Sequence, residues 1–419
     1  MKTRIIEEIK RVEQKYGIEV LYACETGSRA WGFPSPDSDY DVRMIYKHSL
    51  DWYLTLSEKK DNIEYMSEDK EIDLTGWDIR KSLKLLFKSN ASLLERIQSP
   101  IVYAQKEGFV SDYLNYAIQC YSPISTLYHY LKLAENSFEE VSVLKEYRLK
   151  RMFYALRGAV ACKWIMSRNE MPPILFTKRE TAELIKYAAN SFLATKITFI
   201  NEIADLCEKV GANVSDVSTG IGLDGRIGKK FLHPGPGYGG SCFPKDTLAL
   251  VKTAQDYKSP LTLIEHVVES NKKRKRSMYK RITKILPRDK KKKTISVLGL
   301  TFKPNTDDMR DSPSLDIIPA LIKQNYEVRV FDPEGMEEAK KSLIKYKSKI
   351  IWCKNAYEAA LNADVLVILT EWNEFRALDL KKLKKLLKRN VIVDLRNIYN
   401  PIEIRENGFE YYSVGRVSL

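Results

Sequence analysis

Three aspartates near the N-terminus have the types and spacing for metal-assisted chemistry. Asp39 and Asp41 flank Tyr40 at the start of a predicted strand, and residues two apart on a strand point to the same face. Two neighbouring carboxylates repel each other unless a cation lies between them, so this pair favours Mg²⁺. A third carboxylate on a neighbouring strand completes such a site, and Asp73 is placed to supply it. The sequence therefore predicts magnesium ligands at Asp39, Asp41 and Asp73.

A Gly-Ser pair, Gly27 and Ser28, precedes these aspartates in 26-TGSRAWGFPSPDSDYDVRMI-45. Backbone N–H groups and a hydroxyl in such a turn can bind a triphosphate. Nucleotidyl transfer needs both parts, because two metal ions hold the attacking and leaving oxygens of an in-line displacement. A polar loop between two strands is the alternative, and the agreement of several separate elements makes it the weaker one.

A second candidate site surrounds Cys242 in 231-FLHPGPGYGGSCFPKD-246. Its GPGYGG fits G-x-G-x-x-G, but a dinucleotide fingerprint follows an apolar strand and opens a helix, whereas prolines interrupt this segment. We therefore interpret the glycines as letting the backbone wrap closely around a ligand. Lys245 is near enough to stabilise a thiolate, and Asp246 adds a carboxylate. This arrangement favours covalent catalysis through a thioester-type intermediate, and a buried structural cysteine is the alternative.

The elements that must position these residues can be predicted from hydrophobic periodicity. The first part of the chain mixes strands with helices, and a mostly helical region follows. Strands are expected at 18–24, 42–46 and 71–74, and helices from 79 to 168 with a break at 100–109. Residues 177–209 contain neither Pro nor Gly and predict one long helix.

A new unit is predicted to start at Thr294. The apolar strand TISVLGL, the helix SPSLDIIPALIKQ and the strand YEVRVFDP, which ends in Asp332, form a β-α-β unit. Two more apolar strands are expected at 365–369 and 391–395. The pattern predicts a small parallel α/β domain.

The composition excludes several protein classes. With 419 residues, 44% of them hydrophobic and 30% charged, the chain is typical of a soluble protein of two or three domains. It has no apolar run of the length that spans a membrane, and its N-terminus lacks the apolar core of a signal peptide, so we expect a cytoplasmic protein. The six scattered cysteines and four unclustered histidines indicate neither a zinc site nor a disulfide framework. We expect most of the thiols to be buried.

Much of the net charge of +14 lies in 272-KKRKRSMYKRITKILPRDKKKK-293. Such runs are usually solvated faces or linkers, and we interpret this one in that way. Binding of nucleic acid, including RNA, is the alternative, and nothing else in the sequence supports it. A positive field also favours phosphorylated substrates.

The segments TGSRAWGF, SDYDVR, DLTGWD and NASLLERIQSP make residues 1–176 similar to the polymerase-β-like nucleotidyltransferase superfamily. Within it they resemble a group of predicted nucleotidyltransferases linked by name to RNA repair. The resemblance implies an NTP substrate, with Gly27 and Ser28 at the phosphates. It also implies Asp39 and Asp41 as metal ligands and Asp73 as the third carboxylate.

The segments ELIKYAANSFLATKITFINEIADL, FLHPGPGYGGSCFPKD and 298-LGLTFKPNTDDMRDSPS-314 make residues 177–419 similar to the UDP-glucose/GDP-mannose dehydrogenase family. Its UDP-glucose 6-dehydrogenases oxidise UDP-glucose to UDP-glucuronate by two hydride transfers to NAD⁺. The resemblance implies that Cys242 holds the aldehyde as a thiohemiacetal and then as a thioester. Lys186 and Asn190, one helical turn apart, would stabilise the oxyanion, and Asp246 would assist the hydrolytic water.

The same resemblance implies substrate and cofactor contacts. The sugar nucleotide would be wrapped by Phe231, Gly235, Gly237, Tyr238, Gly239 and Gly240. Lys303 would reach the substrate, and Arg226 would reach across a homodimer formed through the 177–209 helix. Arg310 and Lys245 would face the NAD pyrophosphate.

We therefore expect an α/β and α+β multidomain fold. Its predicted parts are a nucleotidyltransferase-like domain at 1–176, a helical central domain at 177–285, a basic linker at 286–293 and a Rossmann-like UDP-binding domain at 294–419. The family also has an N-terminal NAD-binding Rossmann domain, and residues 1–176 show no strand followed by G-x-G-x-x-G. We expect both halves to be truncated where they meet, near Thr177.

Three interpretations of function stay open. The chain is a UDP-glucose 6-dehydrogenase homologue that needs NAD binding from a partner, or a Mg²⁺-dependent nucleotidyltransferase with a UDP-sugar-binding and dimerising module, or an inactive fusion remnant. Of these we favour the first as the family assignment, with UDP-sugar binding without turnover as the expected activity.

Overall fold

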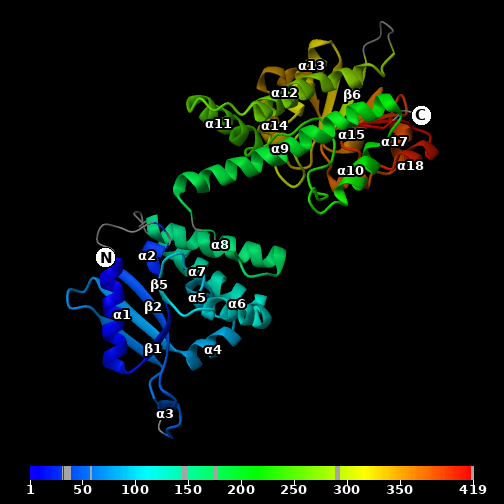
Figure 1. The fold of residues 1–419 in the computed structure, drawn as a ribbon. Coiled ribbons are helices and arrows are strands. Elements are labelled where there is room, and N and C mark those ends of the chain that lie inside the picture. The colour runs from blue at the N-terminus through cyan, green and yellow to red at the C-terminus, as the bar shows by residue number, and fades with distance from the viewer. Residues whose placement is uncertain are drawn as a thin grey trace. The chain divides into compact units, whose positions relative to one another are not determined.

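The computed structural model describes residues 1–30, 32, 39–56, 59–143, 149–173, 175, 177–287 and 293–416. The chain divides into two compact units, Met1–Thr177 and Lys178–Leu419, each of which is described by itself (Figure 1). In the described part of the chain, no helix has the length and apolar character that crossing a membrane requires.

The first unit is built on a five-stranded sheet with the strand order β3-β4-β2-β1-β5. Its strands are β1 (Glu19–Glu25), β2 (Tyr40–Lys47), β3 (Asn62–Met66), β4 (Ile72–Asp78) and β5 (Val102–Gln105). Neighbouring strands are antiparallel except β2 and β4, which are parallel. This parallel pair lies in the middle of the sheet and brings together residues that are about 30 positions apart in the chain.

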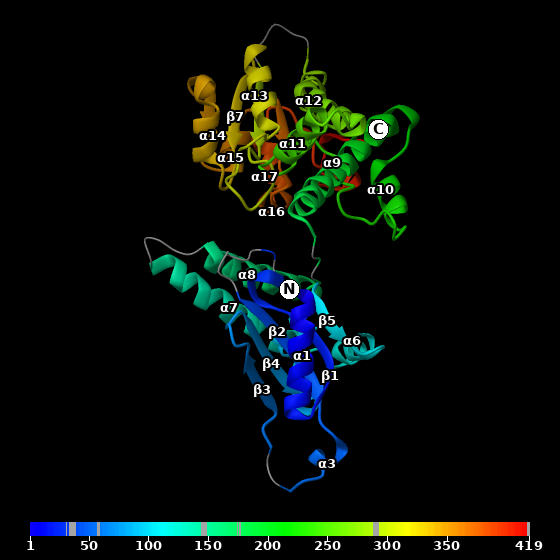
Figure 2. The ribbon, with the colours of Figure 1, turned by 60° about the vertical axis from the view of Figure 1, so that its left-hand side comes forward.

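Helices cover both faces of this sheet. Along one face lies α1 (Lys2–Tyr16), whose Ile5, Ile9 and Val12 recur at helical spacing and are buried against the strands (Figure 2). Gly17, with φ 61°, ends this helix in the left-handed conformation that glycine adopts readily. Side chains of α4 (Ile79–Phe87), α5 (Ala91–Arg96) and α6 (Phe109–Cys120) form a second core on the opposite face. The remaining helices of the unit are α2 (Gly27–Ala30), α3 (Leu50–Tyr53), α7 (Pro123–Val143) and α8 (Leu149–Arg168).

The second unit begins with helices that surround the cysteine loop. The 32-residue helix α9 (Arg179–Val210) packs against α11 (Phe243–Asp256) and α12 (Thr262–Thr283). A shorter helix, α10 (Val214–Gly222), follows α9. The segment between α10 and α11 has no regular secondary structure and carries the glycines and Cys242.

A six-stranded parallel sheet forms the rest of the second unit, in the order β11-β10-β9-β6-β7-β8. Its strands are β6 (Thr294–Leu298), β7 (Glu327–Phe331), β8 (Ile350–Trp352), β9 (Val365–Ile368), β10 (Val391–Asp394) and β11 (Glu410–Ser413). The helices between them are α13 (Ser314–Lys323), α14 (Met336–Ser342), the 3-10 helix η1 (Ile344–Lys349), α15 (Ala356–Ala360), α16 (Asn373–Arg376), α17 (Leu380–Leu386) and α18 (Pro401–Glu406). Because hydrophobic cores lie on both faces, the central strands are continuous apolar runs.

The predicted fold class is confirmed, since a sheet that is antiparallel apart from β2 and β4 is followed by a helical region and a parallel sheet. Four short strands, β3, β5, β8 and β11, have no counterpart in the sequence prediction. Of these, β5 lies within the segment 100–109 that was predicted to be a break between helices. Residues 288–292 of the predicted linker 286–293 lie outside the described part of the chain.

The interpretation of the basic run as a solvated face or linker holds for the exposed Lys272, Lys273, Arg276 and Lys280 but not for Arg274 and Lys275. Residues 272–283 continue α12, and the side chains of Arg274 and Lys275 are only 7% exposed. Arg274 binds Asp205 of α9, and the ammonium of Lys275 lies 3.6 Å from the carboxylate of Asp311. These two cations are therefore structural, and they join α12 to α9 and to the segment after β6.

Candidate functional site

The first site starts at Gly27, which opens α2 directly after β1. Gly27 has φ +63°, and the position that a Cβ would take there overlaps the carboxylate of Asp41. A glycine is therefore required both by the backbone conformation and by the close approach of Asp41. The side chain of Ser28 and residues 33–38 lie outside the described part of the chain.

Asp41 and Asp73 lie side by side because β2 and β4 are parallel and in register at these positions. A guanidinium lies between them, since Arg43 Nη2 is 2.8 Å from Asp41 Oδ1 and 3.0 Å from Asp73 Oδ2. Asp39 stands just before β2, with an exposed side chain and a carbonyl that accepts a hydrogen bond from Arg29. The structure thus brings two of the three predicted carboxylates together.

The donor chemistry of Asp41 and Asp73 fits a divalent cation, because two adjacent carboxylates need a positive charge between them. Arg43 supplies that charge here. Among the residues that the structure describes, no group of three or more His, Cys, Asp or Glu side chains is close enough to hold a metal ion. The magnesium set of Asp39, Asp41 and Asp73 stays a prediction.

A buried carboxylate, Glu25, fixes the backbone of Asp41. It ends β1 and accepts hydrogen bonds from the backbone N–H of Asp41 (2.8 Å) and the hydroxyl of Tyr103 (2.5 Å). Burial raises the pKa of Glu25. The sequence analysis missed Glu25 and Arg43, although Arg43 is two residues after Asp41 and so shares its face of the strand.

In the second unit, the glycine-rich loop is held by side chains of α9 and α12. Asn201 of α9 accepts a hydrogen bond from Gly235 N (2.8 Å). Asn271 of α12 binds both the N–H and the carbonyl of Tyr238, at 2.9 and 3.0 Å, and Arg274 Nε donates to Gly235 O at 2.7 Å. Because these partners are buried, their hydrogen bonds hold the backbone of the loop firmly at Gly235 and Tyr238.

The glycines of this loop serve the packing of the protein itself. Gly237 and Gly240 have φ values of 116° and 88°, which side chains rarely adopt. A Cβ at Gly239 would overlap the carbonyl of Asp311, and one at Gly240 would lie 2.6 Å from the ring of Phe302. The interpretation that these glycines admit a ligand is therefore incomplete, because two of them admit the segment after β6.

Cys242 is the N-cap of α11 and has an exposed side chain. The other five cysteines are buried or half-buried, as expected for most of them. Pro244 and Lys245 lie in the first turn of the helix. The N–H that proline lacks would have no partner within the helix at this position, so Pro244 costs no hydrogen bond. The thiol therefore stands at the end of the loop, open to solvent and to a ligand.

Two of the predicted catalytic residues, Lys186 and Asn190, meet at the carboxylate of a third, Asp246. Asp246 is buried, and it accepts hydrogen bonds from Asn190 Nδ2 (2.6 Å) and Lys186 Nζ (3.3 Å). The hydrogen bond to Asp246 raises the pKa of Lys186, and the charge of Cys242 contributes to that rise. The prediction that Lys186 and Asn190 share one helix face is confirmed.

A pocket of about 710 Å³ opens beside Cys242. The predicted residues that line it are Phe231, Gly237, Tyr238, Gly239, Gly240, Cys242 and Lys303. Arg226 does not line it and pairs with Asp224, while Arg310 pairs with Asp308, a residue of the pocket wall. Lys245 and Gly235 are also outside the lining.

Arg396 is a residue of this pocket that the sequence analysis missed. It follows β10 at the carboxyl end of the parallel sheet, where ligands of such sheets bind. Its guanidinium donates to the carbonyls of Leu369 (2.8 Å) and Phe302 (3.1 Å) and lies 3.2 Å from Glu371. Its position directly after a buried strand was the signal that could have identified it.

The parallel sheet has the strand order of dinucleotide-binding folds, but it does not fit NAD in their manner. Asp332, at the end of β7, occupies the place where such folds bind a ribose hydroxyl. Its carboxylate is fully buried and accepts the N–H groups of Leu300, Thr301 and Gly335. At Gly299, a Cβ would lie 2.5 Å from the Cβ of Thr370, so the turn at Gly299 packs directly against Thr370.

Comparison with known protein families assigns both units. Residues 1–197 match the RNA repair pathway DNA polymerase beta family. Residues 180–273 match the central domain of the UDP-glucose/GDP-mannose dehydrogenase family, and residues 296–401 match its UDP binding domain. The first half of α9 therefore belongs to both matches.

Similar curated proteins align with the second unit. A UDP-glucose 6-dehydrogenase of Rhizobium meliloti (strain 1021) is 60% identical over 244 residues, which are 58% of this chain and 55% of that protein. UDP-glucose 6-dehydrogenase TuaD of Bacillus subtilis (strain 168) is 47% identical over 247 residues, 59% of this chain and 53% of that protein. The chain spans about half the length of the curated relatives it matches.

A solved structure of a UDP-glucose dehydrogenase from the archaeon Pyrobaculum islandicum is also similar to this chain. The two are 30% identical with a TM-score of 0.52, and the aligned part is 62% of this chain and 57% of the archaeal chain.

Proposed function

We propose that the second unit of this chain binds a UDP-sugar beside Cys242. This unit contains the central and UDP-binding domains of the UDP-glucose/GDP-mannose dehydrogenase family, and they follow an RNA repair pathway DNA polymerase beta domain. One observation carries the proposal. The exposed cysteine opens onto a pocket of about 710 Å³ whose wall contains Lys303 and Arg396. Lys303 suits a pyrophosphate, and the aromatic rings of the wall suit a base, whereas Arg396 is paired with Glu371 and holds two backbone carbonyls.

Cys242 is the proposed nucleophile of this site. In the two-step oxidation of the family, its thiolate would add to the C6 aldehyde that remains after the first hydride transfer to NAD⁺, and the resulting oxyanion would need hydrogen-bond donors. The ammonium of Lys186 and the amide of Asn190 are such donors, and both already contact Asp246. We propose that Asp246 accepts a proton from the water that hydrolyses a thioester. The donors and the base thus form one hydrogen-bonded set.

NAD supplies the hydride acceptor in this family, and Lys245 and Arg310 are the residues proposed to face it. Asp332, at the position where dinucleotide-binding folds bind a ribose hydroxyl, is instead used by the backbone N–H groups of Leu300, Thr301 and Gly335. We therefore expect the chain by itself to bind UDP-glucose without turnover. A partner that holds NAD in the correct geometry would make it a dehydrogenase.

Alkylation of Cys242 tests this proposal. UDP-glucose is expected to slow the reaction of Cys242 with iodoacetamide, measured by mass spectrometry of the full chain. Cys120, which is half-buried in the first unit, is the internal control and should be unaffected. Equal alkylation of Cys242 with and without UDP-glucose would contradict the proposal.

Absorbance of NADH tests the absence of turnover. The full chain with UDP-glucose and NAD⁺ is expected to form no NADH. Sustained NADH formation that is lost in Cys242→Ala would identify a complete dehydrogenase instead.

The first unit has a second candidate function, Mg²⁺-dependent nucleotidyl transfer. The observation that favours it is the contact of Gly27 with Asp41, which lies beside Asp73. Mg²⁺-dependent release of pyrophosphate from an NTP is expected, and the double variant Asp39→Asn with Asp41→Asn should abolish it. An RNA end is one acceptor to supply in this assay, because the family is described by an RNA repair pathway. Equal release by both proteins would count against the function.

A further inference from the structure

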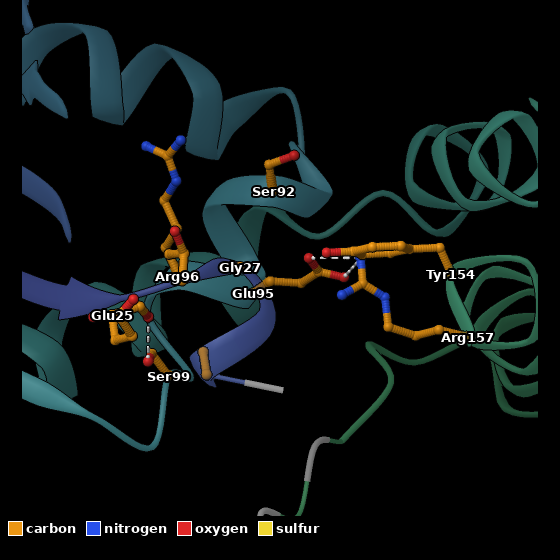
Figure 3. A pocket seen from close by; sticks show the side chains of 10 residues that line it. Glu25, Gly27, Ser92, Glu95, Arg96, Ser99, Tyr154 and Arg157 are labelled. Atoms are coloured by element: carbon orange, nitrogen blue, oxygen red, sulfur yellow. Dashed lines mark hydrogen bonds and ion pairs between the residues drawn. The ribbon is translucent and has the colours of Figure 1, made fainter. Parts of the chain in front are cut away.

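A second cavity lies in the first unit and has Gly27 in its wall (Figure 3). It is lined by Gly27 and by residues of α5 and α8, including Glu95, Tyr154 and Arg157. Gly27 also touches Asp41, so the cavity and the carboxylates share one wall. Burial raises the pKa of Tyr154, and the negative charges of Asp41 and Glu95 add to the rise. The ring of Tyr154 therefore lies within electrostatic range of the reaction centre.

The size of this cavity limits what it can hold. Its volume is about 210 Å³. Pockets that hold a whole drug-sized ligand have volumes of roughly 300–1,000 Å³. The cavity therefore accommodates one part of a ligand whose remainder extends past Gly27.

The charges of the wall disfavour a phosphate. Glu95 and Arg157 form an ion pair at 3.3 Å, so their charges cancel (Figure 3). The guanidinium of Arg96 lies 3.5 Å from the centre of the Trp77 ring. A group that is uncharged and has hydrogen-bonding edges fits this wall better than an anion.

The wall instead matches a planar heterocycle. The guanidinium of Arg157 lies 5.1 Å from the centre of the Tyr154 ring, so a base stacked on this ring would extend an existing cation–aromatic contact. Stacking on aromatic rings is how proteins commonly hold unpaired bases. Glu95 accepts hydrogen bonds, while Ser92 and Arg157 can donate them. The carboxylate of Glu95 is held in place by the hydroxyl of Tyr130, at 3.0 Å, and by Arg157. A fixed acceptor beside fixed donors is what the edge of a nucleobase requires.

We propose that this cavity binds the base of the nucleoside triphosphate whose phosphates lie at Gly27 and Asp41. The proposal rests on the nucleotidyl transfer function proposed for the first unit. Tyr154 stacks on the base, and Glu95 accepts a hydrogen bond from its ring N–H or amino group. The pocket thereby makes the first unit selective among nucleotides.

Binding of tripolyphosphate and of nucleotides to the full chain separates the two proposals. Tripolyphosphate reports only the phosphate site, whereas an NTP reports the phosphate site and the cavity. The wild type is titrated calorimetrically with Mg²⁺ and tripolyphosphate, ATP, GTP, CTP or UTP. We expect one NTP to bind more tightly than the others and more tightly than tripolyphosphate.

The variants Tyr154→Leu and Glu95→Gln then test the cavity. Each is expected to weaken binding of the preferred NTP about tenfold, because stacking and edge recognition are lost, while tripolyphosphate affinity stays the same. Tyr128→Leu, at an exposed tyrosine of α7, is the matched control and should bind as the wild type does. Melting curves of each variant check that it is folded.

Two outcomes overturn the inference, and they are distinguishable. If both variants bind the NTP as tightly as the wild type does, the cavity does not hold the base, and the transferase proposal stands. If the wild type binds neither tripolyphosphate nor any NTP, the transferase proposal fails and the base pocket fails with it.

Discussion

Arg43 occupies the position between Asp41 and Asp73 where a metal ion is expected. Its side chain is 16% exposed, and its guanidinium also donates to the carbonyls of Val42 and Asp73, both at 3.1 Å. If Mg²⁺ binds there as predicted, it must compete with Arg43 for the same two carboxylates. The guanidinium would then have to move away or share the carboxylate oxygens.

The variant Arg43→Gln tests this competition. Without Mg²⁺, the two carboxylates lose their cation, and we expect a loss of about 1–3 kcal/mol, between the values for exposed and buried ion pairs. Mg²⁺ should then raise the melting temperature of the variant more than that of the wild type. Arg4→Gln, at an exposed ion pair, is the control and should respond to Mg²⁺ as the wild type does. Equal Mg²⁺ effects in all three proteins would rule out the competition.

Sequence spacing predicted one of the two sites better than the other. Lys186 and Asn190 are four residues apart on a helix, so their common face follows from helix geometry alone, and the structure brings both to Asp246. The contact of Arg43 with Asp73 depends instead on the register of β2 against β4. That register is set by the packing of the whole sheet and is not readable from either strand alone.

At the scale of elements, α9 carries an exposed apolar stripe. Ile185, Phe192, Phe199 and Leu206 are exposed by 46, 65, 49 and 53% and are spaced seven residues apart. A spacing of seven keeps side chains on one seam of a helix, as in coiled coils. The stripe supports the predicted homodimer through this helix.

The variant Phe199→Glu tests the dimer. A charge in the middle of the stripe is expected to convert a dimer into monomers, measured by analytical ultracentrifugation at micromolar concentration. Leu361→Glu, at another exposed apolar residue, should leave the mass unchanged. A wild type that sediments as a monomer would contradict the prediction, as would a variant that stays dimeric.

Long elements were predicted more accurately than short ones. The uninterrupted pattern at 177–209 predicted α9 nearly to its ends, whereas the three residues of β8 give too short a pattern to recognise. The basic run was misjudged at Arg274 and Lys275, because its charges were counted without their positions on the helix. Asn271, Arg274 and Met278 recur at helical spacing on the buried face of α12, and that period was visible in the sequence.

At the scale of the whole molecule, each unit has its own hydrophobic core. The cores of Met1–Thr177 contain the strands β1 to β4, and those of Lys178–Leu419 contain the parallel sheet. A unit with its own core can unfold by itself. We therefore expect the two proposed ligands to act on different cooperative transitions.

Calorimetric melting of the full chain is expected to show two transitions. At about 100 times its Kd, UDP-glucose should stabilise one unit by roughly 2.7 kcal/mol and raise only that transition, by roughly 5–10 °C. Mg²⁺ with the preferred NTP should raise only the other. A single transition that both ligands raise equally would show that the units are coupled.

Calorimetric titration of the full chain with UDP-glucose tests the central claim most directly. The account predicts saturable binding with one site per chain, weakened at least about tenfold in Lys303→Ala, which removes a cation from the pocket wall. Lys345→Ala, at an exposed lysine of η1, should bind as the wild type does. No measurable binding by the wild type, or equal affinity in Lys303→Ala, would contradict the account.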